Sequence, residues 1–96
     1  MSAPLITAQI EWHGIAISIS YRESRWKSDF DHIEVCVAGG EEIPITETGY
    51  RSHFLPHGIV DEFGGAESYV IAWLDHEAEK PEWKRRAEAA RQYSLL

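Results

Sequence analysis

Two runs of alternating apolar and polar residues near the start of the chain constrain its fold more than any other feature. They cover residues 5–12 and 15–21, and a period of two with β-branched residues is typical of half-buried strands. His13-Gly14 separates the runs, which is the length of a tight hairpin turn in which glycine supplies a positive φ. The turn predicts a register in which every inward pair is apolar: Trp12 with Ile15, Ile10 with Ile17, Ala8 with Ile19, and Ile6 with Tyr21.

Two more strands are predicted from the stretch that follows. Residues 32–38 alternate in the same way and predict a third strand. Residues 43–48 predict a fourth, and because Pro44 cannot donate a backbone hydrogen bond, we expect this strand at an edge of the sheet. Residues 50–55 are expected to continue extended, and the polar residues 23–31 to form a loop.

After Pro56 the spacing of apolar residues changes from that of strands to that of helices. Residues 58–63 predict one helical turn, and residues 66–79 place apolar side chains along one stripe of an amphipathic helix. Pro81 is well placed as the first residue of a final helix. Strands that precede helices predict the α+β class, with a four-stranded antiparallel sheet followed by two helices packed on one face.

The four tryptophans are expected to differ in role. Trp12 and Trp73 lie on predicted core stripes, and Trp83 is expected to cover the junction between the last two helices. Trp26, in the predicted loop between charged neighbours, is expected to cap one end of the core or to be an exposed anchor.

Length and composition indicate a single domain over residues 1–96, with strands in 5–55 and helices in 58–94. The chain is 44% hydrophobic, too apolar for a disordered chain, yet no apolar run approaches the ~18 residues of a membrane span. The first ten residues carry no base, unlike a secretory signal. The single cysteine, Cys36, cannot form an internal disulfide. We therefore expect a cytoplasmic protein without a membrane partner.

Charge is segregated along the chain, whose net charge is −7. Residues 29–79 hold twelve acids and a single base, Arg51, while residues 80–96 are basic. Like charge argues against direct binding of nucleic acid by the middle of the chain and favours a partner with a basic surface. The plainer interpretation is that these acids only keep a small protein in solution.

One group of side chains is predicted to form the contact surface for such a partner. The densest part is residues 45–54, where Arg51 stands between Tyr50 and His53; Arg51 is either a contact or an internal ion-pair anchor for Glu47 or Asp61. Tyrosine and arginine are enriched among residues that dominate binding free energies. The predicted contact residues are Glu41, Glu42, Glu47, Tyr50, Arg51, His53, Asp61, Glu62, Asp75, Glu77 and Glu79.

A catalytic or metal site is the alternative. His53 and His57 are four residues apart, but Pro56 between them argues against a helix that would bring them to one face. A catalytic zinc would need a third ligand, and no spacing selects it among Asp61, Asp75 and His76. We therefore assign no catalytic residue, no metal and no cofactor, and a metal-dependent hydrolase using His53 and His57 remains the enzymatic alternative.

The segments ITETGYRSHF (residues 45–54) and AWLDHEAEKPEW (residues 72–83) resemble small bacterial proteins from plasmids and prophages. Neither motif is tied to an activity, so the resemblance implies a mobile-element setting and no catalytic residue. Small acidic proteins in that setting include anti-CRISPR and anti-restriction inhibitors, an analogy of size and charge.

These observations together predict a non-enzymatic, acidic protein-binding module. Its most concrete form is an inhibitor that occupies a basic nucleic-acid-binding groove of a partner protein. A homodimer, built through the edge strand with Pro44 or through the final helix, is a further alternative.

Overall fold

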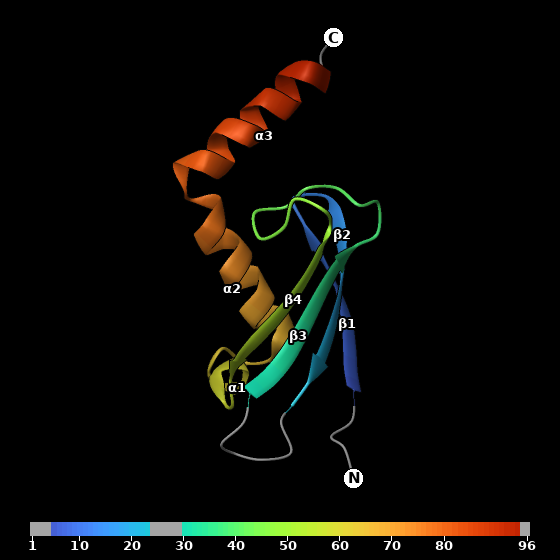
Figure 1. Ribbon diagram of the computed structural model, residues 1–96, viewed down its shortest axis with the longest axis vertical. Coiled ribbons are helices and arrows are strands. Elements are labelled where there is room, and N and C mark those ends of the chain that lie inside the picture. The colour runs from blue at the N-terminus through green and yellow to red at the C-terminus, as the bar shows by residue number, and fades with distance from the viewer. Residues whose placement is uncertain (1–4, 24–29, 95–96) are drawn as a thin grey trace.

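The computed structural model describes residues 5–23 and 30–94, and the side chains of that part up to residue 89. Four strands are followed by three helices (Figure 1), which confirms the predicted α+β class. The sheet is antiparallel with the strand order β1-β2-β3-β4. The elements are β1 (Leu5–Trp12), β2 (Ile15–Arg22), β3 (Phe30–Val37), β4 (Tyr50–Pro56), α1 (Ile59–Glu62), α2 (Ala66–Ala78) and α3 (Pro81–Ser94).

The first hairpin has the predicted register in full. Trp12 pairs with Ile15, and the three further apolar pairs follow at two-residue steps along β1 and β2. His13 and Gly14 have φ values of 50° and 81°, so both turn residues are left-handed, as a two-residue hairpin of this twist requires. Local turn chemistry and the apolar pattern therefore specify the same structure.

The prediction of a fourth strand over residues 43–48 is wrong, because the fourth strand is β4. Ile43 and Thr46 instead exchange two backbone hydrogen bonds of 3.0 Å and close a tight turn. The turn folds Ile43 and Ile45 into the core, so the alternating pattern reflects burial in a loop. Gly49, at a φ of 85°, passes so close to Gly40 that a Cβ would lie 2.8 Å from the Gly40 Cα.

The remaining boundaries agree with the sequence to within a few residues. The third strand begins at Phe30, two residues earlier than predicted, and Pro81 is the first residue of α3. The predicted position of Trp26 lies outside the described residues.

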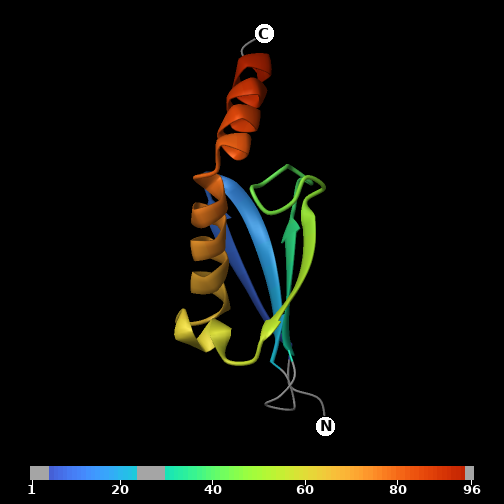
Figure 2. The ribbon, with the colours of Figure 1, turned by 60° about the vertical axis from the view of Figure 1, so that its left-hand side comes forward.

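The core lies between one face of the sheet and α2, which runs along that face in Figure 2. Its helical contribution is Val70 and Leu74 from α2, with Val60 from α1. The sheet contributes the inward residues of its strands: Trp12, Ile17, Ile19, Tyr21, Ile33, Val35, Val37 and Leu55. Among the described elements no helix covers the opposite face (Figure 2).

Helix α3 continues past the end of the sheet (Figure 1). Its base is held by Trp83, whose ring lies 6.2 Å from that of Trp12, and Trp12 Nε1 donates a 3.0 Å hydrogen bond to Asp75. The first hairpin thus contacts the α2–α3 junction directly. None of the described helices is long and apolar enough to cross a bilayer.

Candidate functional site

The predicted contact residues do not gather at one place. Glu41, Glu42 and Glu47 lie in the loop between β3 and β4, which is at the same end of the sheet as the end of α2 with Asp75, Glu77 and Glu79. Asp61 and Glu62 belong to α1, which lies at the other end of the sheet (Figure 1). The acidic residues are therefore divided between two ends of the molecule.

Bases at the start of α3 and just before it partner most of the acids at the first end. Arg86 Nη1 lies 2.6 Å from Glu42 and 2.7 Å from Glu47. Lys80 lies 2.6 Å from Glu77, and Lys84 lies 3.5 Å from Glu79. Part of the charge segregation seen in the sequence is therefore used within the molecule, where the basic end of the chain folds against the acidic middle.

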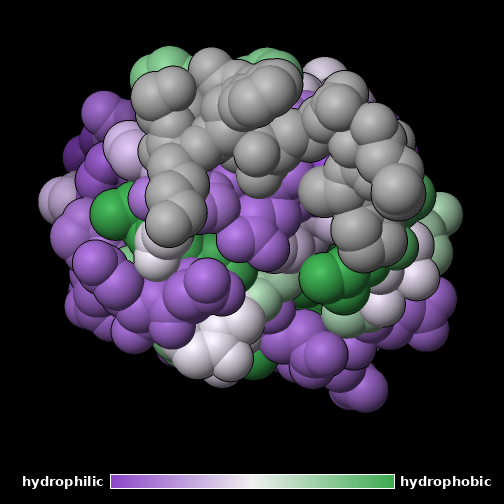
Figure 3. Space-filling model, turned by 90° about the horizontal axis from the view of Figure 1, so that it is seen from below, coloured by the Kyte–Doolittle hydropathy of each residue, from purple (hydrophilic) through white to green (hydrophobic). Residues whose placement is uncertain are grey.

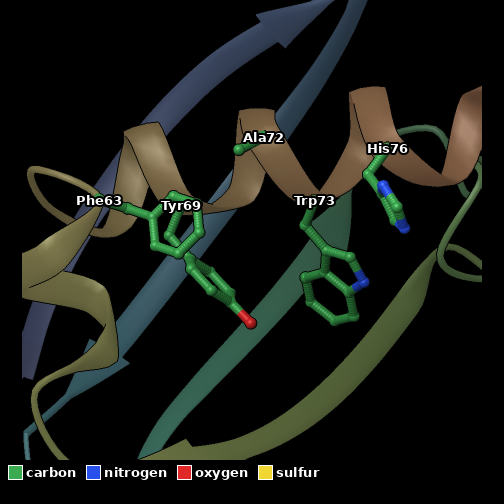
Figure 4. Close-up of a pocket in the computed structure, with 5 residues that line it drawn as sticks. All are labelled: Phe63, Tyr69, Ala72, Trp73 and His76. Atoms are coloured by element: carbon green, nitrogen blue, oxygen red, sulfur yellow. The ribbon is translucent and has the colours of Figure 1, made fainter.

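An open cavity of about 400 Å³ lies beside α2 and is lined largely by aromatic rings. Figure 4 shows Tyr69 and Trp73 projecting from α2, with Phe63 at one end and His76 at the other. Tyr69, Trp73 and His76 are spaced by four and three residues, which places them along one side of the helix. We call this cavity, together with Arg51 and His53 of β4, whose side chains contact the Trp73 ring, the aromatic groove.

The strand side of the groove holds two of the predicted contact residues. The ring of His53 lies 4.4 Å from that of Trp73, and the Arg51 guanidinium lies 5.8 Å from the Trp73 ring centroid. Side chains alternate along β4, so Tyr50 points to the opposite face of the sheet. Within the described residues Arg51 pairs with neither Glu47 nor Asp61; it contacts an aromatic ring instead.

Protonation in the groove is set by burial. Burial lowers the pKa of His53, and the positive charge of Arg51 lowers it further, so the ring is neutral at physiological pH. Burial raises the pKa of Tyr69, whose hydroxyl stays protonated. Tyr69 Oη lies 3.3 Å from His53 Nε2, within hydrogen-bonding distance of the neutral ring. Tyr69 and His53 are therefore neutral, and the Arg51 guanidinium lies beside them at the Trp73 ring.

A second polar cluster is buried at the α1 end of the sheet. Asp31 is fully buried and accepts hydrogen bonds from Tyr21 Oη at 3.2 Å, His57 Nδ1 at 3.0 Å and the Gly58 backbone N–H at 3.2 Å. The hydrogen bond to Asp31 raises the pKa of His57, and burial followed by the Asp31 charge raises that of Tyr21. This carboxylate joins β2, β3 and the turn into α1.

The two histidines of the enzymatic alternative do not converge. His53 contacts Tyr69 and Trp73 in the groove, whereas His57 is held by Asp31. Among residues 5–23 and 30–94, no three side chains of the metal-binding types are grouped to hold an ion. The described residues thus supply no ligand set for that alternative.

Sequence reasoning missed most of the groove. Tyr69 and Trp73 were expected on the core stripe, and they do pack against the core, but each is only half-buried. Phe63, at the end of the predicted helical turn, is 47% exposed. The sequence signal for the groove was the aromatic stripe of α2, which is wider than the face that a helix buries against one sheet.

Residues 6–83 match the family described as the KlcB third domain. No curated protein and no solved structure matches the chain. KlcB is plasmid-associated, so the match supports the plasmid setting that the resemblance implied. The matched residues include nearly all of the sheet with α1 and α2, and thus the whole aromatic groove. The chain therefore belongs to the KlcB third-domain family.

Proposed function

We propose that this chain is a non-enzymatic protein-binding module whose contact surface is the aromatic groove. The observation that carries the proposal is the set of three rings, Phe63, Tyr69 and Trp73, left accessible beside Arg51. Tryptophan, tyrosine and arginine dominate binding free energies at interfaces when they surround a pocket that excludes water. A concave, mainly apolar surface with a few polar groups is the usual form of a recognition site.

The partner of this proposal has a basic surface next to the part that it places in the groove. The net charge of −7 supports this, as do Asp61 and Glu62, which are exposed next to Phe63 and form no ion pair within the described residues. The described surface around the α1 end is largely hydrophilic, with separate hydrophobic patches (Figure 3). Charge of this kind increases the rate of encounter with a cationic partner more than it increases affinity.

The most specific form of the proposal is an inhibitor that occupies the nucleic-acid-binding groove of its partner. It is supported by the net negative charge and by the plasmid setting of the family. Its test is competition: the chain should displace nucleic acid from the partner it captures. A partner that binds the chain and nucleic acid at the same time would contradict the inhibitory form and leave the binding module in place.

The binding proposal is tested with exposed groove residues, whose replacement leaves the core intact. The chain is immobilised and used to capture proteins from lysates of plasmid-bearing bacteria, and the captured proteins are quantified by mass spectrometry. Phe63→Ser and Arg51→Gln should each reduce capture of the principal partner by about tenfold, as expected for residues at the centre of an interface. Ile71→Ser is the matched control, since Ile71 is an exposed apolar residue of α2 that does not line the groove. Equal capture by all three variants would contradict the proposal.

A further inference from the structure

The outer edge of β4 is open, and its backbone pattern can be read from the pairing with β3. The Val37 N–H donates to the Gly49 carbonyl at 2.7 Å, which fixes which β4 residues face β3. Because hydrogen-bonded and non-bonded pairs alternate in antiparallel strands, Arg51 and His53 bond to β3. The N–H and C=O groups of Ser52 and Phe54 therefore point away from the sheet, where no described segment pairs with them.

Both ends of this edge are closed by the chain itself. At the first end, Thr46 Oγ1 donates to the Tyr50 carbonyl at 2.7 Å, and the Thr48 hydroxyl lies 3.4 Å from the same oxygen. At the other end, Pro56 has no N–H to offer. Proteins usually blunt or cover an edge strand to prevent unwanted pairing. Here no described residue pairs with the backbone around Ser52 and Phe54, and this window is long enough for a short extended segment.

The aromatic groove lies directly beside this window. Arg51 and His53, which flank Ser52 on the inner face, contact Trp73 of α2, and Tyr69 and Trp73 point from α2 toward the strands in Figure 4. A strand added to β4 would alternate its side chains between the two faces of the sheet. Those on the inner face would enter the groove, so the edge and the groove form a single recognition surface.

We propose that β4 accepts an extended segment of a partner protein as a fifth strand, with alternate apolar side chains in the aromatic groove and a lysine or arginine at the end that reaches α1. This inference rests on the proposed function and specifies its partner. Backbone hydrogen bonds to Ser52 and Phe54 would provide affinity, and the groove would select the side chains, as in other cases of strand addition. Asp61 and Glu62 would pair with the terminal base, because they are exposed beside Phe63 and have no ion pair within the described part of the chain.

The first test identifies the segment. A displayed library of random twelve-residue peptides is selected on the full chain, with counter-selection on Phe63→Ser. Enriched peptides should alternate apolar and polar residues over about five positions, exclude proline there and carry a base at one end. The inference would be overturned if the enriched peptides had apolar residues at helical spacing or acidic ends, or if no peptide were enriched.

The second test locates the contact by amide hydrogen exchange in NMR, with a synthetic form of the most enriched peptide. The Ser52 and Phe54 amides should exchange fast in the free chain and at least about tenfold more slowly with peptide. The matched control is the outer edge of β1, where the same alternation points the Thr7 and Gln9 amides away from β2; these should not change. Ser52→Pro removes the outward N–H donor and also the 2.7 Å hydrogen bond between Ser52 Oγ and His32 Nε2, whereas Ser52→Ala removes the side-chain bond alone. Ser52→Pro should weaken binding about tenfold, whereas Ser52→Ala and Gln9→Pro should not.

The remaining outcomes separate this inference from the proposed function. One outcome is that the peptide changes the NMR chemical shifts of Trp73 and Tyr69 without slowing amide exchange at Ser52 and Phe54. That result would overturn strand addition, while the groove would remain a binding site. Protection that appears without peptide and grows with protein concentration would assign the edge to a second copy of the chain and overturn the partner segment. If lysate capture also fails to depend on Phe63, the proposed function falls as well.

Discussion

Replacement of Asp31 should strongly lower the free energy of unfolding. Its carboxylate is fully buried and accepts hydrogen bonds from Tyr21, His57 and the Gly58 N–H. Asp31→Ala leaves the buried Tyr21 hydroxyl and the partly buried His57 and Gly58 donors without their acceptor. Hydrogen bonds to a charged group contribute about 1.5–3 kcal/mol each, and breaking a buried charge pair typically costs about 3–5 kcal/mol. We expect a loss of about 3–5 kcal/mol in the free energy of unfolding.

Urea denaturation followed by tryptophan fluorescence measures this loss. A domain of this size is stable by about 5–15 kcal/mol, so Asp31→Ala should remove a large part of the total. Asp31→Asn is the matched control, because its amide oxygen still accepts from Tyr21 or Gly58; we expect it to lose less. Tyr21→Phe removes one donor and should cost about 1–2 kcal/mol. A loss below about 1 kcal/mol for Asp31→Ala, at an unchanged m-value, would refute the structural role of this carboxylate.

Three further predictions test other contacts. The pKa of His57 is raised in the folded state, so its pairing with Asp31 contributes its full stabilisation below the unfolded pKa near 6.5. This stabilisation is lost as the pH rises through the folded pKa. The free energy of unfolding should therefore fall between about pH 5.5 and 8.5, and His57→Gln should make this fall smaller. Arg86→Met should speed amide exchange in α3 while global stability changes by less than about 2 kcal/mol, since the two ion pairs of Arg86 are partly exposed. Gly49→Ala should lower stability by more than about 1 kcal/mol in the same urea assay, because a Cβ there meets the Gly40 backbone at a positive φ.

The sequence could predict the first hairpin because everything that determines it is local. The turn residues, the alternating apolar positions and the register all lie within residues 5–22. The fourth strand depends on a tertiary contact instead. Ile43 and Ile45 alternate as in a strand, yet a turn buries both, and the approach of Gly49 to Gly40 starts β4 only afterwards. A local pattern cannot distinguish these two ways of burying the same isoleucines.

The groove could not be predicted for a related reason. Helical spacing shows that Tyr69 and Trp73 share a stripe near that of Val70 and Leu74, but it does not show where the helix crosses the sheet. In the structure α2 packs on β1 and β2 and leaves the β4 side open. Residues at the flank of the stripe then meet His53 across a groove and are only half-buried.

The course of α3 explains why that side stays open. A second helix laid back over β3 and β4 would cover the groove and complete a standard two-layer domain. Instead, Trp83 packs against Trp12 and Arg86 binds Glu42 and Glu47, which holds α3 beyond the end of the sheet. The inner face of β4 is left to the side chains of Tyr69 and Trp73. The ion pairs that partner Glu42 and Glu47 with Arg86 therefore also hold α3 away from the aromatic groove, and the charge pattern and the accessible groove have one structural cause.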